Sequence, residues 1–282
     1  MAKKKILLLS DDLRMSSGVG TMSREFVLGT LKHYDWVQVG GAIKHPDEGK
    51  VIDMNESVRK DSGVEDAYLK IYPTSGYGNP DMIRQIIQVE GGVDAILHYT
   101  DPRFWGWLYQ MEHELRRTTP IFYYNIWDDL PYPRWNEPFY ESCDLIMNIS
   151  KQTVNIVDNV CQITPRTDWD NTYVPHGINE NNFYPIDSSH KEWGDLLKFK
   201  RNVTGNKDYK YIVFWNNRNI RRKLPGDVVM AYKQFCDQLP KEEAKKCVLI
   251  MHTQPRDENG TDLPEVVKQC CPDYDVIFSH QK

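Results

Sequence analysis

Short apolar runs alternate with helical patterns along the chain, and this alternation is what most constrains the fold. The first run, at 6–10, is continuous, which is typical of a central parallel strand, and a helical pattern follows at 18–32. Further strand-like runs lie at 36–43, 68–72, 94–98, 121–125 and 145–149, with helical patterns at 81–89, 103–115, 134–140 and 151–160. This β-α-β order predicts an α/β fold with helices on both faces of a parallel sheet.

A polar segment at 177–208 separates this series from a second, shorter one, and the length of 282 residues also favours two domains. The second series has strand-like runs at 211–215, 247–252 and 276–278, and helical patterns at 226–239 and 263–271. Because three strands are few for a doubly wound sheet, we expect the second domain to be incomplete. The predicted organisation is an N-terminal Rossmann-like domain (1–178), an interdomain linker (179–208) and the start of a C-terminal domain (209–282).

The charge and composition of the chain argue against several classes of protein. The net charge of -5 and the pI near 5.9 argue against general nucleic-acid binding. No apolar run is long enough to span a membrane, and the run near the N-terminus is too short for a signal peptide. The six cysteines lack CxxC or Cys/His ligand spacing, which indicates reduced thiols rather than a metal site. We therefore expect a cytoplasmic protein without a structural metal.

A basic loop follows the strand-like run at 211–215. The sequence NNRNIRRK, at 216–223, lies between that strand and the helical pattern at 226–239 and carries Arg218, Arg221, Arg222 and Lys223. Guanidinium and ammonium groups at the carboxyl end of a parallel strand suit an oxyanion, and a helix N-terminus adds unpaired N–H groups. The loop predicts a binding site for a phosphorylated ligand.

Two glycine-containing turns are weaker candidates. Gly18 and Gly20 lie between the first strand and the first helix, where they would let a phosphate or sugar approach the backbone. The spacing is neither a dinucleotide fingerprint nor a P-loop, so a plain tight turn is an equally good interpretation. His176 and Gly177 belong to a Pro-His-Gly turn, which by itself favours a hinge without chemistry.

Polar residues follow two other strands. His98 ends the run at 94–98, where it could act as a general base or bind a hydroxyl, although a lone histidine is more often structural. Asp128 and Asp129 follow the run at 121–125 and could bind hydroxyls or a metal, or cap a helix. The aromatic side chains at 104–109 could form a platform for a sugar or a base, but core packing is the more common role.

The order of these motifs resembles the GT-B glycosyltransferases of family 4. The resemblance rests on the Gly-rich first loop, on Val-Pro-His-Gly-Ile-Asn…Phe-x-Pro at 174–185, and most specifically on Arg218-x4-Lys223. It implies two Rossmann-like domains, of which the first mainly binds the acceptor and the second mainly binds the nucleotide sugar. The implied reaction moves a sugar from a donor such as a UDP- or GDP-sugar to a hydroxyl of a glycan, lipid, protein or modified nucleic-acid base.

The resemblance also implies roles for particular residues. Arg218 and Lys223 would hold the donor diphosphate and stabilise the leaving group, without a metal or other cofactor and with retention of configuration. The donor-side residues would be these two together with Gly18, Gly20, His176 and Gly177. The expected catalytic residues are Arg218, Lys223, His98 and Asp128.

Two departures from the family pattern leave alternatives open. Trp127 stands where members often carry histidine, and a Glu-x7-Glu segment that binds sugar and ribose would lie beyond residue 278. A non-catalytic GT-B-like binding or assembly module is therefore the main alternative. A nicotinamide-dependent Rossmann enzyme fits less well, because the third glycine and a ribose-binding acid near 43–45 are missing.

Overall fold

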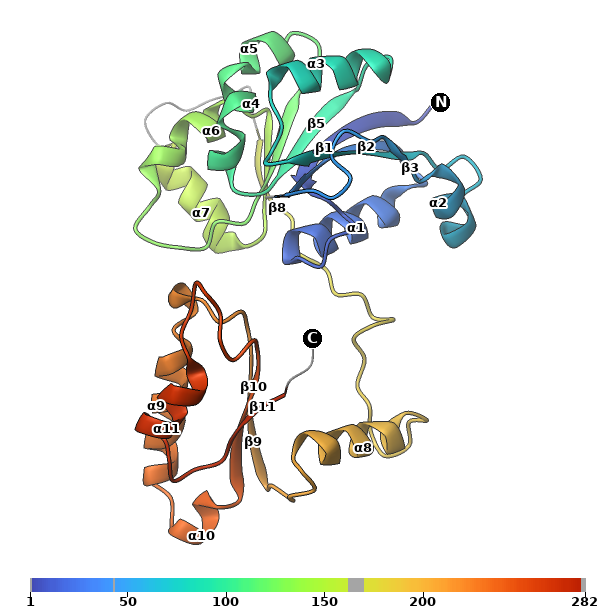
Figure 1. Ribbon diagram of the computed structural model, residues 1–282. Coiled ribbons are helices and arrows are strands. Elements are labelled where there is room, and N and C mark those ends of the chain that lie inside the picture. Colours follow the sequence, from blue (N-terminus) through green and yellow to red (C-terminus); the bar gives the residue numbers. More distant parts are fainter. Residues whose placement is uncertain (1, 43, 162–169, 280–282) are drawn as a thin grey trace. The chain divides into compact units, whose positions relative to one another are not determined.

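The computed structural model describes residues 2–42, 44–161 and 170–279, and the chain divides into two compact units (Figure 1). The N-terminal unit is Met1–Phe183 and the C-terminal unit is Tyr184–Lys282. The division falls inside the linker predicted at 179–208, and the helical part of that linker belongs to the C-terminal unit as α8 (Trp193–Val203). Residue 43, the last of the predicted second strand, lies outside the described residues.

The N-terminal unit is built on an eight-stranded sheet of order β3-β4-β2-β1-β5-β6-β7-β8. All neighbouring strands are parallel except β3 and β4. The strands are β1 (Lys4–Asp11), β2 (Tyr34–Ala42), β3 (Ile52–Asp53), β4 (Leu69–Ser75), β5 (Ala95–Tyr99), β6 (Ile121–Asn125), β7 (Leu145–Asn148) and β8 (Asp170–Tyr173). The predicted α/β class and parallel sheet are confirmed, whereas the short strands β3 and β8 had no counterpart among the predicted strands.

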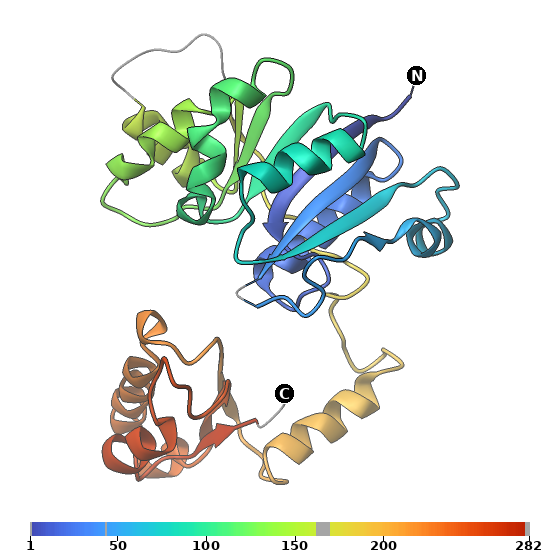
Figure 2. The same ribbon diagram turned by 45° about the horizontal axis from the view of Figure 1, so that its top comes forward.

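Helices cover both faces of this sheet (Figures 1 and 2). Leu7 and Leu9 of β1 pack in one buried cluster with the α3–α7 side, while Leu8 packs in another with α1 and α2. The helices are α1 (Gly18–Thr30), α2 (Asn55–Ser62), α3 (Pro80–Val89), α4 (Gly106–Gln110), α5 (Glu112–Leu115), α6 (Glu137–Glu141) and α7 (Lys151–Val160), with 3-10 turns η1 (Pro102–Trp105) and η2 (Arg134–Asn136). The alternation of buried side chains along β1 is what a strand covered on both faces requires.

The single helix predicted at 103–115 is wrong, because this segment forms η1, α4 and α5 instead. Trp105 leaves the helical conformation (φ -113°, ψ 24°), and its buried indole donates a hydrogen bond to Thr100 Oγ1 at 2.7 Å. Met111 makes the second break (φ -105°, ψ 14°). Tertiary packing of Trp105 therefore overrides the local helical pattern.

The C-terminal unit has a parallel three-stranded sheet of order β11-β10-β9. Its strands are β9 (Tyr211–Asn216), β10 (Cys247–His252) and β11 (Val276–Phe278), as the sequence predicted, and its other elements are η3 (Arg221–Lys223), α9 (Pro225–Asp237), α10 (Lys241–Ala244) and α11 (Leu263–Cys270). Helices α9 and α11 pack on one face through Val229, Tyr232 and Leu263. Within the described ranges, no helix of either unit is long and apolar enough to cross a membrane.

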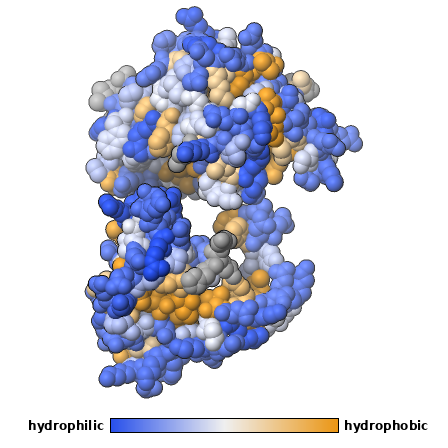
Figure 3. Space-filling view, viewed as in Figure 1, coloured by the Kyte–Doolittle hydropathy of each residue, from blue (hydrophilic) through white to orange (hydrophobic). Residues whose placement is uncertain are grey.

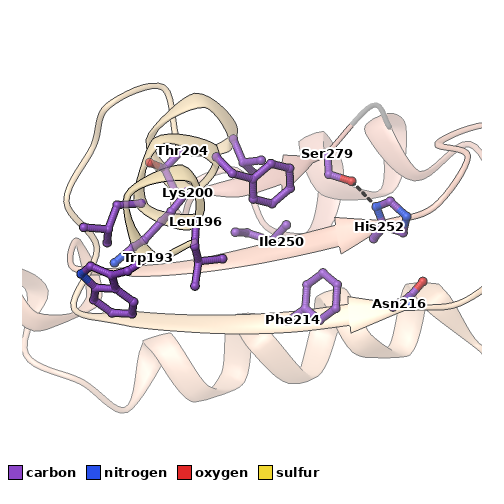
Figure 4. A pocket seen from close by; sticks show the side chains of 12 residues that line it. Trp193, Leu196, Lys200, Thr204, Phe214, Asn216, Ile250, His252 and Ser279 are labelled. Carbon is purple, nitrogen blue, oxygen red and sulfur yellow. Dashed lines mark hydrogen bonds between the residues drawn. The ribbon is translucent and has the colours of Figure 1, made fainter. Parts of the chain in front are cut away.

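The other face of this sheet is only partly covered. A groove of about 530 Å³ runs between α8 and the strands, with Leu196, Phe214 and Ile250 directed into it (Figure 4). Its few polar groups include His252, whose Nδ1 lies 2.7 Å from Ser279 Oγ. Apolar surface is accordingly visible over the strands of this unit (Figure 3). None of the predicted site residues lines the groove, which is apolar where a phosphate site would be basic.

Candidate functional site

The basic loop at the carboxyl end of β9 is the best-formed candidate site. Arg218 Nε lies 3.2 Å from Asp257 Oδ2, and the Arg218 side chain is 64% exposed. Asp257 also accepts a hydrogen bond from the Asn259 backbone, and this bond together with Arg218 lowers the pKa of its carboxyl. Lys223 is half-buried, and its ammonium makes no ion pair with any described residue. Arg218 is thus oriented through one nitrogen, with its two terminal nitrogens open to a ligand.

The start of α9 adds a second feature to this loop. Leu224, the residue before the helix, has a left-handed backbone (φ 46°, ψ 49°) and is 58% exposed. A non-glycine residue in this region costs on the order of 1–3 kcal/mol, and such strain is concentrated at functional sites. No side chain caps α9, and Pro225 follows Leu224 as the first helical residue. Lys223, the last residue of η3, therefore lies beside an uncapped helix N-terminus, which favours an anion.

Asn219 anchors this loop, a role that the sequence analysis missed. It is fully buried, its Nδ2 lies within 3.2 Å of the carbonyl oxygens of Gln254, Pro255 and Thr261, and its Oδ1 accepts the Thr261 N–H. Gly260 makes this contact feasible, because a Cβ there would lie 2.1 Å from the Asn219 carbonyl oxygen. The basic loop is thereby fixed to the loop between β10 and α11. The partners are distant in sequence, so the only local signal was the asparagine-rich stretch itself.

His98 does not lie where the sequence analysis expected it. Strand β5 continues to Tyr99, so His98 is inside the sheet and fully buried rather than at the strand end. Its Nδ1 lies 2.7 Å from Tyr109 Oη, and its ring stacks on Tyr123 at 5.1 Å. Burial lowers its pKa to about 3. His98 is therefore a neutral histidine of the core, and its role in catalysis stays a prediction.

Asp128 is exposed in the loop after β6. The backbone there is held from both sides, because Gln152 donates to the Asp128 carbonyl at 3.2 Å and Thr153 Oγ1 donates to the Trp127 carbonyl at 2.8 Å. The Asp128 carboxylate has no ion-pair partner among the described residues. It remains a candidate for contacting a ligand hydroxyl.

The two glycines of the first loop differ in their surroundings. Ser17 caps α1, and its Oγ accepts the Gly20 N–H at 2.9 Å. A Cβ at Gly20 would lie 2.8 Å from the carbonyl oxygens of Asp12 and Met15, so this glycine is required by packing within the loop. Gly18 is exposed and has no neighbour within 4 Å of a Cβ position. Of the two, only Gly18 presents open space at the helix N-terminus.

The Pro-His-Gly turn packs on the N-terminal unit. The His176 ring stacks on Tyr124 at 5.4 Å, and its Nε2 lies 3.4 Å from Tyr99 Oη. Partial burial lowers the pKa of His176. Gly177 is exposed and does not have a left-handed φ, so the turn places no special demand for glycine there. Among the described residues, no group of three or more His, Cys, Asp and Glu side chains could hold a metal ion.

This chain resembles known proteins in its three-dimensional structure rather than in its sequence. No family model and no curated protein sequence matches it. The N-terminal domain of Candida albicans trehalose-6-phosphate phosphatase aligns over 100% of this chain and 73% of its own, with 13% identity and a TM-score of 0.66. The Burkholderia xenovorans UDP-forming trehalose-phosphate synthase, solved with glucose-6-phosphate, covers 99% and 75% with 10% identity and a TM-score of 0.61. The chain has the GT-B fold.

A further solved structure, from E. coli and bound with UDP-2-fluoro glucose, aligns at 12% identity with a TM-score of 0.57, over 99% of this chain and 74% of its own. At these identities the alignments show the fold alone. The predicted fold class is therefore confirmed, and membership of family 4 stays a prediction.

Proposed function

We propose that this protein transfers a sugar from a nucleotide-sugar donor to an acceptor hydroxyl. The observation that carries the proposal is the pair formed by the exposed Arg218 and the half-buried Lys223 beside the uncapped start of α9. A nucleoside diphosphate would place its phosphates against the N–H groups of α9 and between these two cations. The donor is a UDP- or GDP-sugar, and the enzyme is a retaining transferase of the family 4 type.

The proposed chemistry follows from the charge that develops as the donor breaks. When the bond between the anomeric carbon and the phosphate oxygen opens, negative charge grows on the departing diphosphate. Arg218 and Lys223 neutralise that charge, so the proposed mechanism uses side-chain cations where another enzyme would use a divalent metal. The leaving phosphate oxygen takes the acceptor proton as the new glycosidic bond forms on the same face of the sugar.

The electrostatic roles can be tested by substitution within the loop. We expect Arg218→Ala and Lys223→Ala to lower turnover of the nucleotide-sugar donor at least 100-fold, since removing one charged stabiliser of a transition state costs about 3–4 kcal/mol. Arg222→Ala is the matched control, because Arg222 is an exposed cation of the same loop without a proposed role, and it should retain near-normal turnover. The assay measures release of UDP or GDP from a panel of nucleotide sugars.

Two results would contradict the proposal in different ways. Near-normal turnover in Arg218→Ala and Lys223→Ala would refute the assigned roles. No binding of UDP or GDP by the wild-type protein, with no turnover of any donor, would instead support the non-catalytic module that lacks a complete donor site.

A further inference from the structure

A row of aromatic side chains lies at the carboxyl edge of the N-terminal sheet. Tyr77 follows β4, Phe104 follows β5, and Trp127 and Trp135 follow β6. The Tyr77 and Phe104 rings are stacked at 5.1 Å with an interplanar angle of 16°, and the two tryptophan rings lie 6.0 Å apart. The guanidinium of Arg103, the residue before Phe104, lies over the Trp127 ring at 5.7 Å from its centre.

Two rings of the row are exposed, whereas Tyr77 and Trp127 are partly buried against the core. Phe104 is 57% exposed and Trp135 is 55% exposed. A Cβ at Gly41 would lie 2.8 Å from Tyr77 Cδ1, so the Tyr77 ring occupies the space that a side chain at the end of β2 would take. Trp107 Nε1 donates to the Tyr77 carbonyl at 3.2 Å and holds the turn in place. Exposed aromatic rings on a fixed backbone are typical of a binding surface.

Carboxylates accompany the rings. Asp11, the last residue of β1, is half-buried, accepts a hydrogen bond from the Ser17 hydroxyl at 2.9 Å and has no cationic partner among the described residues. Burial raises the pKa of Asp11, and burial followed by the charges of Asp11 and Asp101 raises the pKa of the Tyr77 phenol. Asp11 is the register partner of Gly41 across β1 and β2, and the Tyr77 ring lies against Gly41, so Asp11 and Tyr77 belong to the same part of the sheet edge.

Two guanidinium groups of this region are already engaged. Arg103 binds both carboxylate oxygens of Asp101, with Nε at 2.9 and 3.1 Å from them. Arg14 binds Asp12 at 2.8 Å and Asp47 at 3.2 Å. Neither of these two guanidinium groups is free to offset the repulsion between Asp11 and a phosphorylated ligand, whereas a neutral ligand meets no such repulsion.

We propose that Tyr77, Phe104, Trp127 and Trp135, together with Asp11, form a subsite for a neutral carbohydrate acceptor. The aromatic faces pack against the C–H faces of sugar rings, and Asp11 and the Tyr77 hydroxyl bind sugar hydroxyls. The inference rests on the proposed function, since it names the acceptor class of the same transferase. A nucleic-acid acceptor is disfavoured because its phosphates would also meet these carboxylates.

The test measures binding of defined probes rather than turnover. The probes are the neutral sugars glucose, maltose and cellobiose, the charged glucose 6-phosphate, a short single-stranded oligonucleotide, and UDP, each titrated against the full chain and followed by saturation-transfer NMR. We expect at least one neutral sugar to bind. Trp135→Ala and Phe104→Ala should weaken that binding about tenfold, the change that loss of one aromatic face produces.

Tyr34→Ala is the matched control, because Tyr34 is a partly exposed aromatic residue at the opposite, amino end of β2, and it should leave sugar binding unchanged. UDP affinity should be the same in all three variants, which separates this inference from the donor site. The subsite is overturned if no neutral sugar binds, if glucose 6-phosphate or the oligonucleotide binds more tightly than every neutral sugar, or if Trp135→Ala binds sugar as the wild type does.

Discussion

Strands β1 and β9 carry the same kind of apolar sequence but lie in opposite surroundings. In β1, Leu7, Leu8 and Leu9 are almost fully buried, because β2 and β5 pair with its two edges and helices cover both faces. In β9, Ile212 is 40% exposed and Phe214 is 61% exposed, because β10 is its one partner strand among the described residues and the sheet face that Phe214 lines is only partly covered. An apolar run therefore specifies a strand, whereas its burial depends on neighbours from elsewhere in the chain.

The contrast extends to what each sheet presents at its carboxyl edge. The enclosed N-terminal sheet offers aromatic rings and carboxylates, while the C-terminal sheet ends in a cationic loop next to an uncapped helix. Aromatic rings and carboxylates suit a ligand rich in hydroxyl groups, whereas a cationic loop beside a helix N-terminus suits phosphates. If this contrast holds, the two units divide recognition of acceptor and donor between them.

The largest expected effect is the difference in stability loss when an apolar side chain is truncated in β1 and in β9. Leu9→Ala should destabilise the N-terminal unit by about 2–5 kcal/mol, since it leaves a cavity in a fully packed core. Ile212→Ala should cost less than about 1 kcal/mol, because its side chain is already partly in water. Hydrogen exchange read separately for the peptides of each unit measures both. Equal losses of protection would mean that β9 is as well covered in solution as β1.

The next largest effect concerns the anchored basic loop. Gly260→Ala should destabilise the C-terminal unit by about 1–3 kcal/mol, since a methyl group there overlaps the Asn219 carbonyl. It should also weaken UDP binding, because the loop that carries Arg218 would shift. Gly194→Ala is the control, with open space around the added methyl group. Wild-type UDP affinity in Gly260→Ala would show that the anchor does not position the cations.

A smaller effect is expected at Glu90, a buried carboxylate of the N-terminal unit that takes part in a network of polar side chains. Glu90 accepts hydrogen bonds from the Tyr68 and Tyr72 hydroxyls, both at 2.7 Å, and Lys5 Nζ lies 3.2 Å away. Burial raises the pKa of Glu90, but the bonds from Tyr72, Tyr68 and Lys5 outweigh this and hold it below the usual 4.5. We expect Glu90→Gln to destabilise the unit by about 1–2 kcal/mol at neutral pH.

The lowered pKa of Glu90 determines how its contribution to the stability of the fold changes with pH. A carboxyl with a lower pKa in the folded state stabilises the fold above its unfolded pKa, and this contribution is lost as the pH falls through the folded value. The stability difference between wild type and Glu90→Gln should therefore shrink below about pH 4.5. Denaturant titrations at several pH values measure it, and a difference that persists in acid would exclude an ionic origin.

The sequence predicted the elements that depend on local pattern and missed those set by distant contacts. The strands other than β3 and β8, and the basic loop, were found because apolar runs and clustered cations are local signals. His98 was misjudged because pairing extends β5 by one residue, and the helix at 103–115 failed because Trp105 turns into the core. Two contacts join segments that are far apart in the sequence, so no local pattern predicts them. They are the contact between Asn219 and Gly260 and the contact of the Tyr77 ring with Gly41.

The most direct test of the donor site is calorimetric titration of UDP and GDP into the wild-type protein, Arg218→Ala, Lys223→Ala and Arg222→Ala. We predict that the wild type binds at least one of the two nucleotides. Loss of either proposed cation should weaken binding roughly tenfold or more, since a hydrogen bond to a charged group contributes about 1.5–3 kcal/mol, while Arg222→Ala stays within about threefold of wild type. Absence of binding to both nucleotides, or equal affinities in all four proteins, would contradict a diphosphate site at the start of α9.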